Sequence, residues 1–357
     1  MRPIVRLLML CCLVLAQPVA AEPLEDLYLV RQPIDSQQPA DREAALQRAL
    51  DTLIIRLTGD PQVVESSNLA AVRAEPKQLV RQFGYEGDVL VANFDATSVQ
   101  RALRDAGIAT WGENRPSLLV WWLAESAEGT SLIGDGQGGA DMLRSAAQHR
   151  GLPVQIPLAD LQEQLAVTRD TLERAEPSAF AESSERYDAD ALLTVLAREE
   201  GEGWQARWHV WLGDQHGEGQ ATGTSQEALA DAVMLAVQRY LAPRFVGVEG
   251  ELLSVTLEVE GANLARFAEL DELLQPLGAQ LHQVSGDELI YRLEARPEQL
   301  QAQLELIGLQ PLPDEMPEPS PSVTQPGGAA TGAPIEAAIE KPIEAPATEG
   351  VVLRYGW

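Results

Sequence analysis

The stretch that decides the fold is SLLVWWLAES, residues 117–126, which contains seven consecutive apolar residues. A β-strand alternates its side chains between two faces, and a strand covered on both faces is a continuous apolar run. One face would carry Leu118, Val120, Trp122 and Ala124, and the other Leu119, Trp121 and Leu123. The pattern predicts a central strand with a packed layer on each side. It favours two core tryptophans over an aromatic platform for a ligand.

The residues that follow predict a central α/β domain, residues 116–246. A glycine-ended helix over 138–151 and a short strand over 152–157 make a βαβ unit with a right-handed crossover. Glycine-containing turns separate three further expected strands, at residues 190–200, 203–213 and 216–225. A helix that begins after Ser225 and ends before Pro243 closes the domain.

The residues before the stretch predict a smaller α+β module, residues 22–115. Apolar residues recur along 41–58 at the spacing of one helical face, and Gly59 stands where a left-handed residue ends a helix. Alternating residues on either side of Glu86 and Gly87 predict a hairpin. A strand over residues 27–34 and a helix over residues 97–107 complete this module.

A third module, residues 251–312, has the predicted order strand, helix, strand, strand, helix. This order resembles the small ferredoxin-like modules of envelope assembly proteins, which mostly bind other proteins, although fold analogy is a weak guide to function. Residues 313–350 are rich in proline, alanine and glutamate, which predicts a disordered low-complexity linker. The segment VVLRYGW, residues 351–357, alternates like a strand. It would add to the protein's own sheet, which we expect, or to a partner's sheet.

The first 21 residues predict a cleaved export signal. Arg2 and Arg6 precede a ten-residue apolar run, and Val19 and Ala21 are the small residues of a cleavage site. The signal would direct the chain to the periplasm, and its cleavage would remove both cysteines, so the mature chain could form no disulfide. Of 26 basic residues two lie in the signal, which leaves 24 against 54 acidic ones. Such an acidic chain is a poor partner for nucleic acid.

No motif in the sequence predicts catalysis, a cofactor or a metal. His209 and His216 fall on consecutive expected strands, but two ligands do not make a metal site, and no carboxylate shows a completing spacing. The glycine-rich residues 134–141 lack the spacing of a nucleotide-binding loop and are interpreted as a plain loop. Residues 183–187, SSERY, could set an arginine against acidic groups, but a helical turn is the favoured interpretation.

Trp211 is the best candidate for an exposed aromatic anchor. It falls on the polar face of its expected strand, beside His209, whereas Trp204 and Trp208 fall on the apolar face. Exposed tryptophans are enriched at protein interfaces. A covering helix or the 351–357 segment is the alternative explanation. The complete set of partner-binding candidates is Trp211, Val351, Leu353, Tyr355 and Trp357.

Several segments together resemble a bacterial envelope family known as domain of unknown function 2066. The matching segments are REAALQRALDTLIIRLTGDP, DAGIATWGENRPSLLVWWLAE, HRGLPVQIPLADLQ, SERYDADALLTVLARE, WHVWLGDQHGEGQATGTSQEALADAV and LELIGLQPL. They follow one another over most of residues 25–312. The resemblance implies an exported proteobacterial protein without an assigned activity, and it transfers no catalytic residue.

These observations lead us to expect a non-enzymatic binding or scaffold protein of the bacterial envelope, with mixed α+β and α/β modules. Its expected partner is another envelope protein. The alternative is a hydrolase or modifying enzyme that acts on an envelope polymer. The sequence leaves open the identity of the partner and the oligomeric state.

Overall fold

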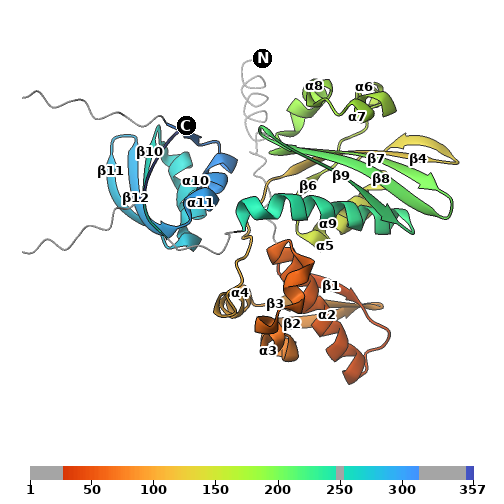
Figure 1. Ribbon diagram of the computed structural model, residues 1–357, viewed down its shortest axis with the longest axis horizontal. Coiled ribbons are helices and arrows are strands. Elements are labelled where there is room, and N and C mark those ends of the chain that lie inside the picture. The colour runs from red at the N-terminus through yellow and green to blue at the C-terminus, as the bar shows by residue number, and fades with distance from the viewer. Residues whose placement is uncertain (1–26, 247–252, 313–350) are drawn as a thin grey trace, which may run out of the picture. The chain divides into compact units, whose positions relative to one another are not determined.

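The computed structural model describes residues 27–246, 253–312 and 351–357 (Figure 1). It has a mixed α+β fold, as expected, in two compact units that cover residues 1–242 and 243–357. The first two modules expected from the sequence therefore share one unit. The predicted export signal and the predicted 313–350 linker lie outside the described residues. No helix in the described ranges is long and apolar enough to cross a membrane.

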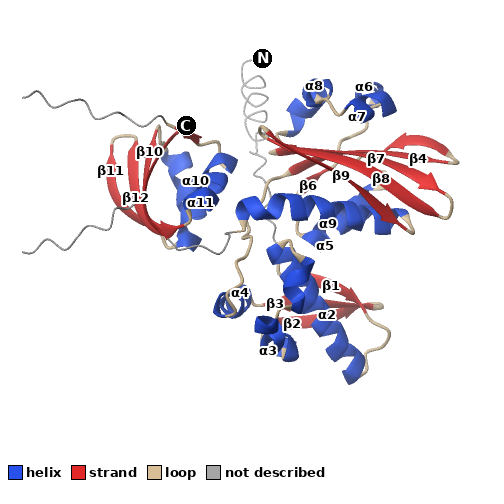
Figure 2. Ribbon diagram, viewed as in Figure 1, coloured by secondary structure: helices blue, strands red, loops and turns tan. Residues whose placement is uncertain are grey.

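The first part of unit 1 is a three-stranded antiparallel sheet packed against a long helix (Figure 2). The strands, in the order β1-β3-β2, are β1 (Leu29–Pro33), β2 (Val80–Glu86) and β3 (Val89–Phe94). The helices are α2 (Pro39–Thr58), α3 (Ala70–Ala74) and α4 (Ala96–Asp105), with short 3₁₀ turns at Pro61–Glu65, Ser67–Leu69 and Pro76–Gln78. Gly59 ends α2 in the left-handed conformation, with φ at 72°, as the sequence predicts. The apolar face of α2 is fully buried here.

The second part of unit 1 is a six-stranded mixed sheet. Its strands are β4 (Leu118–Ser126), β5 (Gly129–Leu132), β6 (Val154–Gln155), β7 (Ala191–Glu200), β8 (Gly203–Leu212) and β9 (Gln215–Gly223). The order is β5-β4-β7-β8-β9, and β6 pairs with β4. Strand β4 runs parallel to both β6 and β7, which confirms the predicted βαβ unit. The edge strand β5 was not expected from the sequence.

Helices cover both faces of this sheet (Figure 1). One layer contains α5 (Ala140–Arg150) and α9 (Gln226–Phe245), and the other contains α6 (Leu161–Ala166), α7 (Arg169–Arg174) and α8 (Ala181–Ser184), with 3₁₀ turns at Pro177–Ala179 and Glu185–Tyr187. Trp121 and Trp122 are 0% and 1% exposed, so the prediction that both tryptophans lie in the core is confirmed. The expected end of α9 before Pro243 was wrong. Pro243 lies in the last turn of α9, although it has no N–H to donate to the residue four positions earlier.

Two buried arginines connect the two parts of unit 1. Arg56 of α2 donates to the main-chain oxygens of Leu27, Leu29 and His149. Arg115 donates to the main-chain oxygens of Arg56, Trp111, Gly112 and Gly151. Its guanidinium also lies over the Trp111 ring, 4.5 Å from the centroid. Since these bonds join α2 to the C-terminal end of α5, they fix one part of the unit against the other.

Unit 2 is a five-stranded sheet with two helices, and it contains the expected strand–helix–strand–strand–helix order. Its elements are β10 (Leu253–Glu260), α10 (Leu264–Leu274), β11 (Gln280–Ser285), β12 (Glu288–Ala295), α11 (Pro297–Leu306), β13 (Gln310–Pro311) and β14 (Val351–Gly356), with a 3₁₀ turn at Gln275–Leu277. The strand order is β11-β12-β10-β14-β13. The segment over 351–357 therefore lies inside the protein's own sheet, which confirms the expected docking.

Candidate functional site

The candidate anchor Trp211 belongs to a group of side chains on β8 and β9 that we call the histidine face. Its members are His209, Trp211, His216 and Glu218. In the antiparallel register His209 lies opposite Glu218, and Trp211 lies opposite His216. Residues opposite one another in a ladder point to the same side of the sheet, so all four side chains share one face. His209 pairs with Thr194 of β7, and Thr194 pairs with Trp121 of β4, so these side chains point to the same face of the sheet. That face is the one covered by α6, α7 and α8.

The three rings of the histidine face lie nearly parallel. The ring centroids of Trp211 and His216 are 4.9 Å apart, and those of His209 and His216 are 5.4 Å apart, each pair with planes 12° from parallel. Nδ1 of His209 lies 3.2 Å from Nε2 of His216 and 3.5 Å from a carboxylate oxygen of Glu218. Two imidazoles and a carboxylate thus meet beside one tryptophan.

His209 is the buried member of this face, with 7% of its surface exposed, whereas His216 and Glu218 are exposed. Burial, with a smaller contribution from His216, lowers the pKa of His209 below its ordinary value. The ring is therefore neutral at pH 7 and can act as an acceptor or a ligand through one nitrogen. Within the described residues, neither His209 Nε2 nor the neighbouring Thr194 Oγ1 has a hydrogen-bond partner.

Sequence reasoning missed Glu218, although it stands only two positions after His216, because its approach to His209 depends on how β8 aligns with β9. The alignment of β8 with β9 across the hairpin decides which side chains lie together. With β8 and β9 joined by a turn at Gly213 and Asp214, the pair Trp211 and His216 fixes the register, and the next pair on that face is His209 and Glu218. His209 and His216 lie on consecutive strands, as expected, and they approach each other across the hairpin.

The other partner-binding candidates lie on β14, which fills a position in unit 2 that we call the strand slot, between β10 and β13. Six residues of β14 pair in parallel with β10, from Val255 opposite Val351 to Glu260 opposite Gly356. On its other side β14 pairs antiparallel with the short β13. Because β13 pairs with β14 and not with β10, the segment over 351–357 joins the two sides of the slot.

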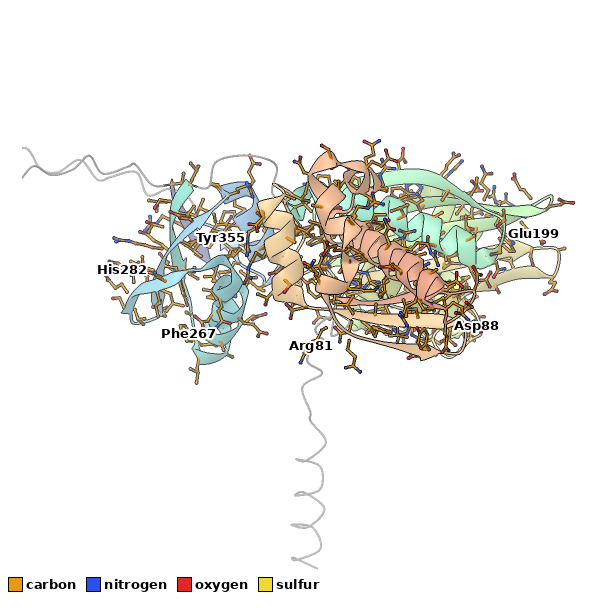
Figure 3. The ribbon with its side chains drawn as sticks, turned by 90° about the horizontal axis from the view of Figure 1, so that it is seen from below. Arg81, Asp88, Glu199, Phe267, His282 and Tyr355 are labelled. Carbon is orange, nitrogen blue, oxygen red and sulfur yellow. The ribbon has the colours of Figure 1, made fainter. Side chains whose placement is uncertain are left out.

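Side chains fix β14 in the slot at both ends. Leu353 and Tyr355 are 9% and 2% exposed, and they belong to the same apolar cluster as Phe267 of α10 (Figure 3). Trp357 donates from its ring nitrogen to the main-chain oxygen of Ile307 at 3.3 Å. On the opposite face of β14, Arg354 pairs with Glu258 at 2.9 Å. Val352 remains 53% exposed.

Residues 183–187 contribute an arginine to a buried carboxylate. Glu163 of α6 is fully buried, accepts hydrogen bonds from Arg186 and Tyr187, and closes a capping box with Asp160. Arg186 pairs with Asp160 at 2.9 Å as well. The helical turn that the sequence favoured is present, and so is the contact with acidic groups. The cluster fastens α6 to the turn after α8, which is a structural role.

Residues 134–139 of the glycine-rich stretch form the loop before α5, as interpreted from the sequence, and Ala140 and Asp141 already belong to the helix. A Cβ at Gly134 would lie 2.5 Å from the Ala159 side chain, so this glycine allows a close approach of two loops. Arg144 pairs with Asp135 and Asp141 on the outside of the loop. Both aspartates of the glycine-rich stretch are thus paired with an arginine of the same chain.

The chain is similar, over residues 21–112, to a family described as a domain of unknown function (DUF8605). This finding overturns the resemblance to domain of unknown function 2066, which was wrong. No curated protein matches the chain.

Two solved structures show a limited likeness. The N-terminal domain of Protein Y from Thermus thermophilus is 12% identical, with 36% of this chain and 96% of that chain covered and a TM-score of 0.15. Protein VC0702 from Vibrio cholerae is 12% identical, with 37% of this chain and 79% of that chain covered and a TM-score of 0.19.

Proposed function

We propose that the chain is an exported, non-enzymatic binding protein of the bacterial envelope whose unit 2 recognises an extended polypeptide strand. The observation that carries this proposal is the position of β14 between β10 and β13. A segment distant in sequence occupies an inner position of the sheet, with residues 313–350 between it and β13. In this proposal β14 is the resting occupant of the strand slot, and a partner offers an equivalent strand.

The slot has the two properties that strand addition requires. Main-chain groups of β10 supply affinity for any extended segment, and pockets for alternate side chains supply specificity. Here Leu353 and Tyr355 are buried in the apolar cluster of unit 2, while Val352 and Arg354 point to the other face. The preferred ligand is therefore a strand with an aliphatic and an aromatic residue two positions apart.

A peptide in trans tests this function directly. A variant that lacks residues 351–357 should bind a fluorescently labelled VVLRYGW peptide saturably, as measured by fluorescence anisotropy. The full chain should bind the same peptide at least tenfold more weakly, because its tethered strand competes at a high effective concentration. The control peptide carries Leu353→Asp and Tyr355→Asp, and it should not bind.

Absence of peptide binding by a deletion variant that retains its far-ultraviolet circular dichroism would reject the strand-recognition function. A photo-crosslinking residue at the exposed Leu253 of β10, the strand that remains in place when β14 is displaced, identifies the envelope partner, in comparison with the same residue at exposed Glu182 of α8. An adduct with an envelope protein from the first position only is the expected result. Recovery of the mature chain from the cytoplasm alone would contradict the proposed export.

A further inference from the structure

We propose that His209, His216 and Glu218 form a binding site for one divalent transition-metal ion of the zinc or copper class. Among the described residues these three bring one ligand atom each to within 4.8 Å of the others. The proposal is independent of strand recognition, because the three residues belong to unit 1 and the strand slot belongs to unit 2.

The spacing of the ligand atoms fits a single ion. Ligand atoms about 2.0–2.1 Å from a tetrahedral zinc ion lie roughly 3.3–3.4 Å from one another. The distances from His209 Nδ1 are 3.2 Å to His216 Nε2 and 3.5 Å to the Glu218 carboxylate. Because the two imidazole planes lie only 12° from parallel, the exposed His216 ring must turn for both nitrogen lone pairs to meet at the ion. Its exposure leaves room for that rotation.

The ligand set selects the class of metal. Neutral imidazole suits zinc, copper and nickel, whereas calcium and magnesium prefer sites made of oxygen atoms alone. Imidazole binds a metal in its neutral form, through a nitrogen that carries no proton. With two imidazoles and one carboxylate, the protein supplies three ligands and leaves the fourth position to water.

Thr194 is the residue placed to orient His209. A ligating histidine normally donates its other ring N–H to a nearby acceptor, which fixes the ring. Thr194 lies directly opposite His209 across β7 and β8, and both its buried hydroxyl oxygen and His209 Nε2 have no hydrogen-bond partner among the residues that the structure describes. Cross-strand neighbours have Cβ atoms about 4.5–5.5 Å apart, so a change of the Thr194 rotamer can bring its hydroxyl oxygen to the ring nitrogen. Binding of the metal at Nδ1 places the ring proton on Nε2. Nε2 can then donate a hydrogen bond to the Thr194 hydroxyl oxygen, so both atoms gain a partner.

Zinc titration of the full chain by isothermal calorimetry tests the site. We expect one saturable high-affinity step in the unmodified protein and its loss in His216→Gln, an exposed position whose substitution leaves the fold intact. Glu218→Gln should weaken zinc binding at least tenfold, and Thr194→Val about tenfold to a hundredfold. The matched controls are His149→Gln and His282→Gln, which remove histidines elsewhere and should leave the step unchanged.

Copper provides a local readout, because bound Cu²⁺ quenches nearby tryptophan fluorescence and Trp211 stacks on His216. Copper should quench the tryptophan fluorescence of the unmodified chain with the same stoichiometry as zinc binding. Trp211→Phe should lose most of that quenching but should still bind zinc in the calorimetric titration. Three outcomes would overturn the site: no saturable zinc binding, a zinc step that survives in His216→Gln, or an equal loss in His149→Gln. The last outcome would assign the metal to other histidines.

Discussion

Arg115 donates a hydrogen bond of 2.9 Å to the main-chain oxygen of Arg56, so two buried guanidinium groups share one junction in unit 1. Burial and the neighbouring charge of Arg56 lower the pKa of Arg115 to about 9. Main-chain oxygens, with the Trp111 ring, surround this cation. The junction is therefore held by many directed hydrogen bonds around charges that are costly to bury.

We expect Arg115→Leu to lower the free energy of unfolding of unit 1 by about 3 kcal/mol, because several buried carbonyl oxygens lose their donor. Urea unfolding followed by tryptophan fluorescence measures the change. The control is Arg104→Leu on the exposed side of α4, where a change below about 0.5 kcal/mol is expected. Equal stability of the two variants would show that the junction contributes nothing to folding.

Docking of β14 should contribute to the stability of unit 2. Leu353→Ala removes a buried side chain of β14 and should lower the free energy of unfolding by about 2–4 kcal/mol. Its neighbour Val352 is 53% exposed, and Val352→Ala should change stability by less than about 0.5 kcal/mol. Thermal unfolding of the full chain checks both. If both substitutions change the stability by less than about 0.5 kcal/mol, docking of β14 does not stabilise unit 2.

Asp231 of α9 should make unit 1 sensitive to acid. Its carboxylate accepts hydrogen bonds from His149, at 2.6 Å, and from Arg150 of α5. Burial raises the pKa of Asp231, but the bonds from His149 and Arg150 outweigh it, and the folded pKa lies below the ordinary value. The stabilisation is therefore present above the unfolded pKa of about 4 and is lost as pH falls through the folded pKa.

The matching experiment compares unfolding from pH 7 to pH 3. The unmodified chain should exceed Asp231→Asn in stability at pH 7, and the difference should shrink as pH falls below about 4. Asp141→Asn serves as the control, because the Asp141 side chain is 91% exposed. A stability difference that stays constant over this range would contradict the assigned pairing.

Glu163 should hold α6 in place. Glu163→Ala removes the acceptor for Arg186 and Tyr187 and should destabilise the region by about 2 kcal/mol, a value kept low because Arg186 is 40% exposed. Glu163→Gln keeps a side-chain acceptor and should cost less. Hydrogen exchange of the α6 amides measures both effects, with Glu182→Ala as an exposed control. If the hydrogen exchange of the α6 amides is the same in Glu163→Ala as in the unmodified chain, Glu163 does not hold α6 in place.

Local patterns predicted most elements of the fold because they depend on nearby residues. The run from Leu118 to Ala124 identified the two-sided strand, and Gly59 identified the end of α2. Register was harder, because it depends on pairing between segments. Glu218 joins the histidines only after β8 and β9 are aligned, and the place of β14 beside β10 depends on paired residues that lie 96 positions apart along the chain, such as Glu260 and Gly356.

Short or exposed elements escaped sequence prediction for a different reason. Strand β5 has four residues, of which Leu132 is buried, so its apolar signal is weak. The last turn of α9 continues past Pro243, where tertiary packing of Phe245 outweighs the local preference of proline. In both places the decisive contacts lie outside the segment itself.

The place of β14 also sets an order of events during synthesis. The unpaired edge of β10 is made long before its partner, and it stays open until the chain has been extended as far as residue 356. Pairings between segments so distant in sequence form slowly, and open strand edges promote association between chains. A chain whose synthesis stops between β10 and residue 351 would keep this strand edge unpaired and prone to association. The yield of correctly folded protein therefore depends on synthesis of residues 351–356.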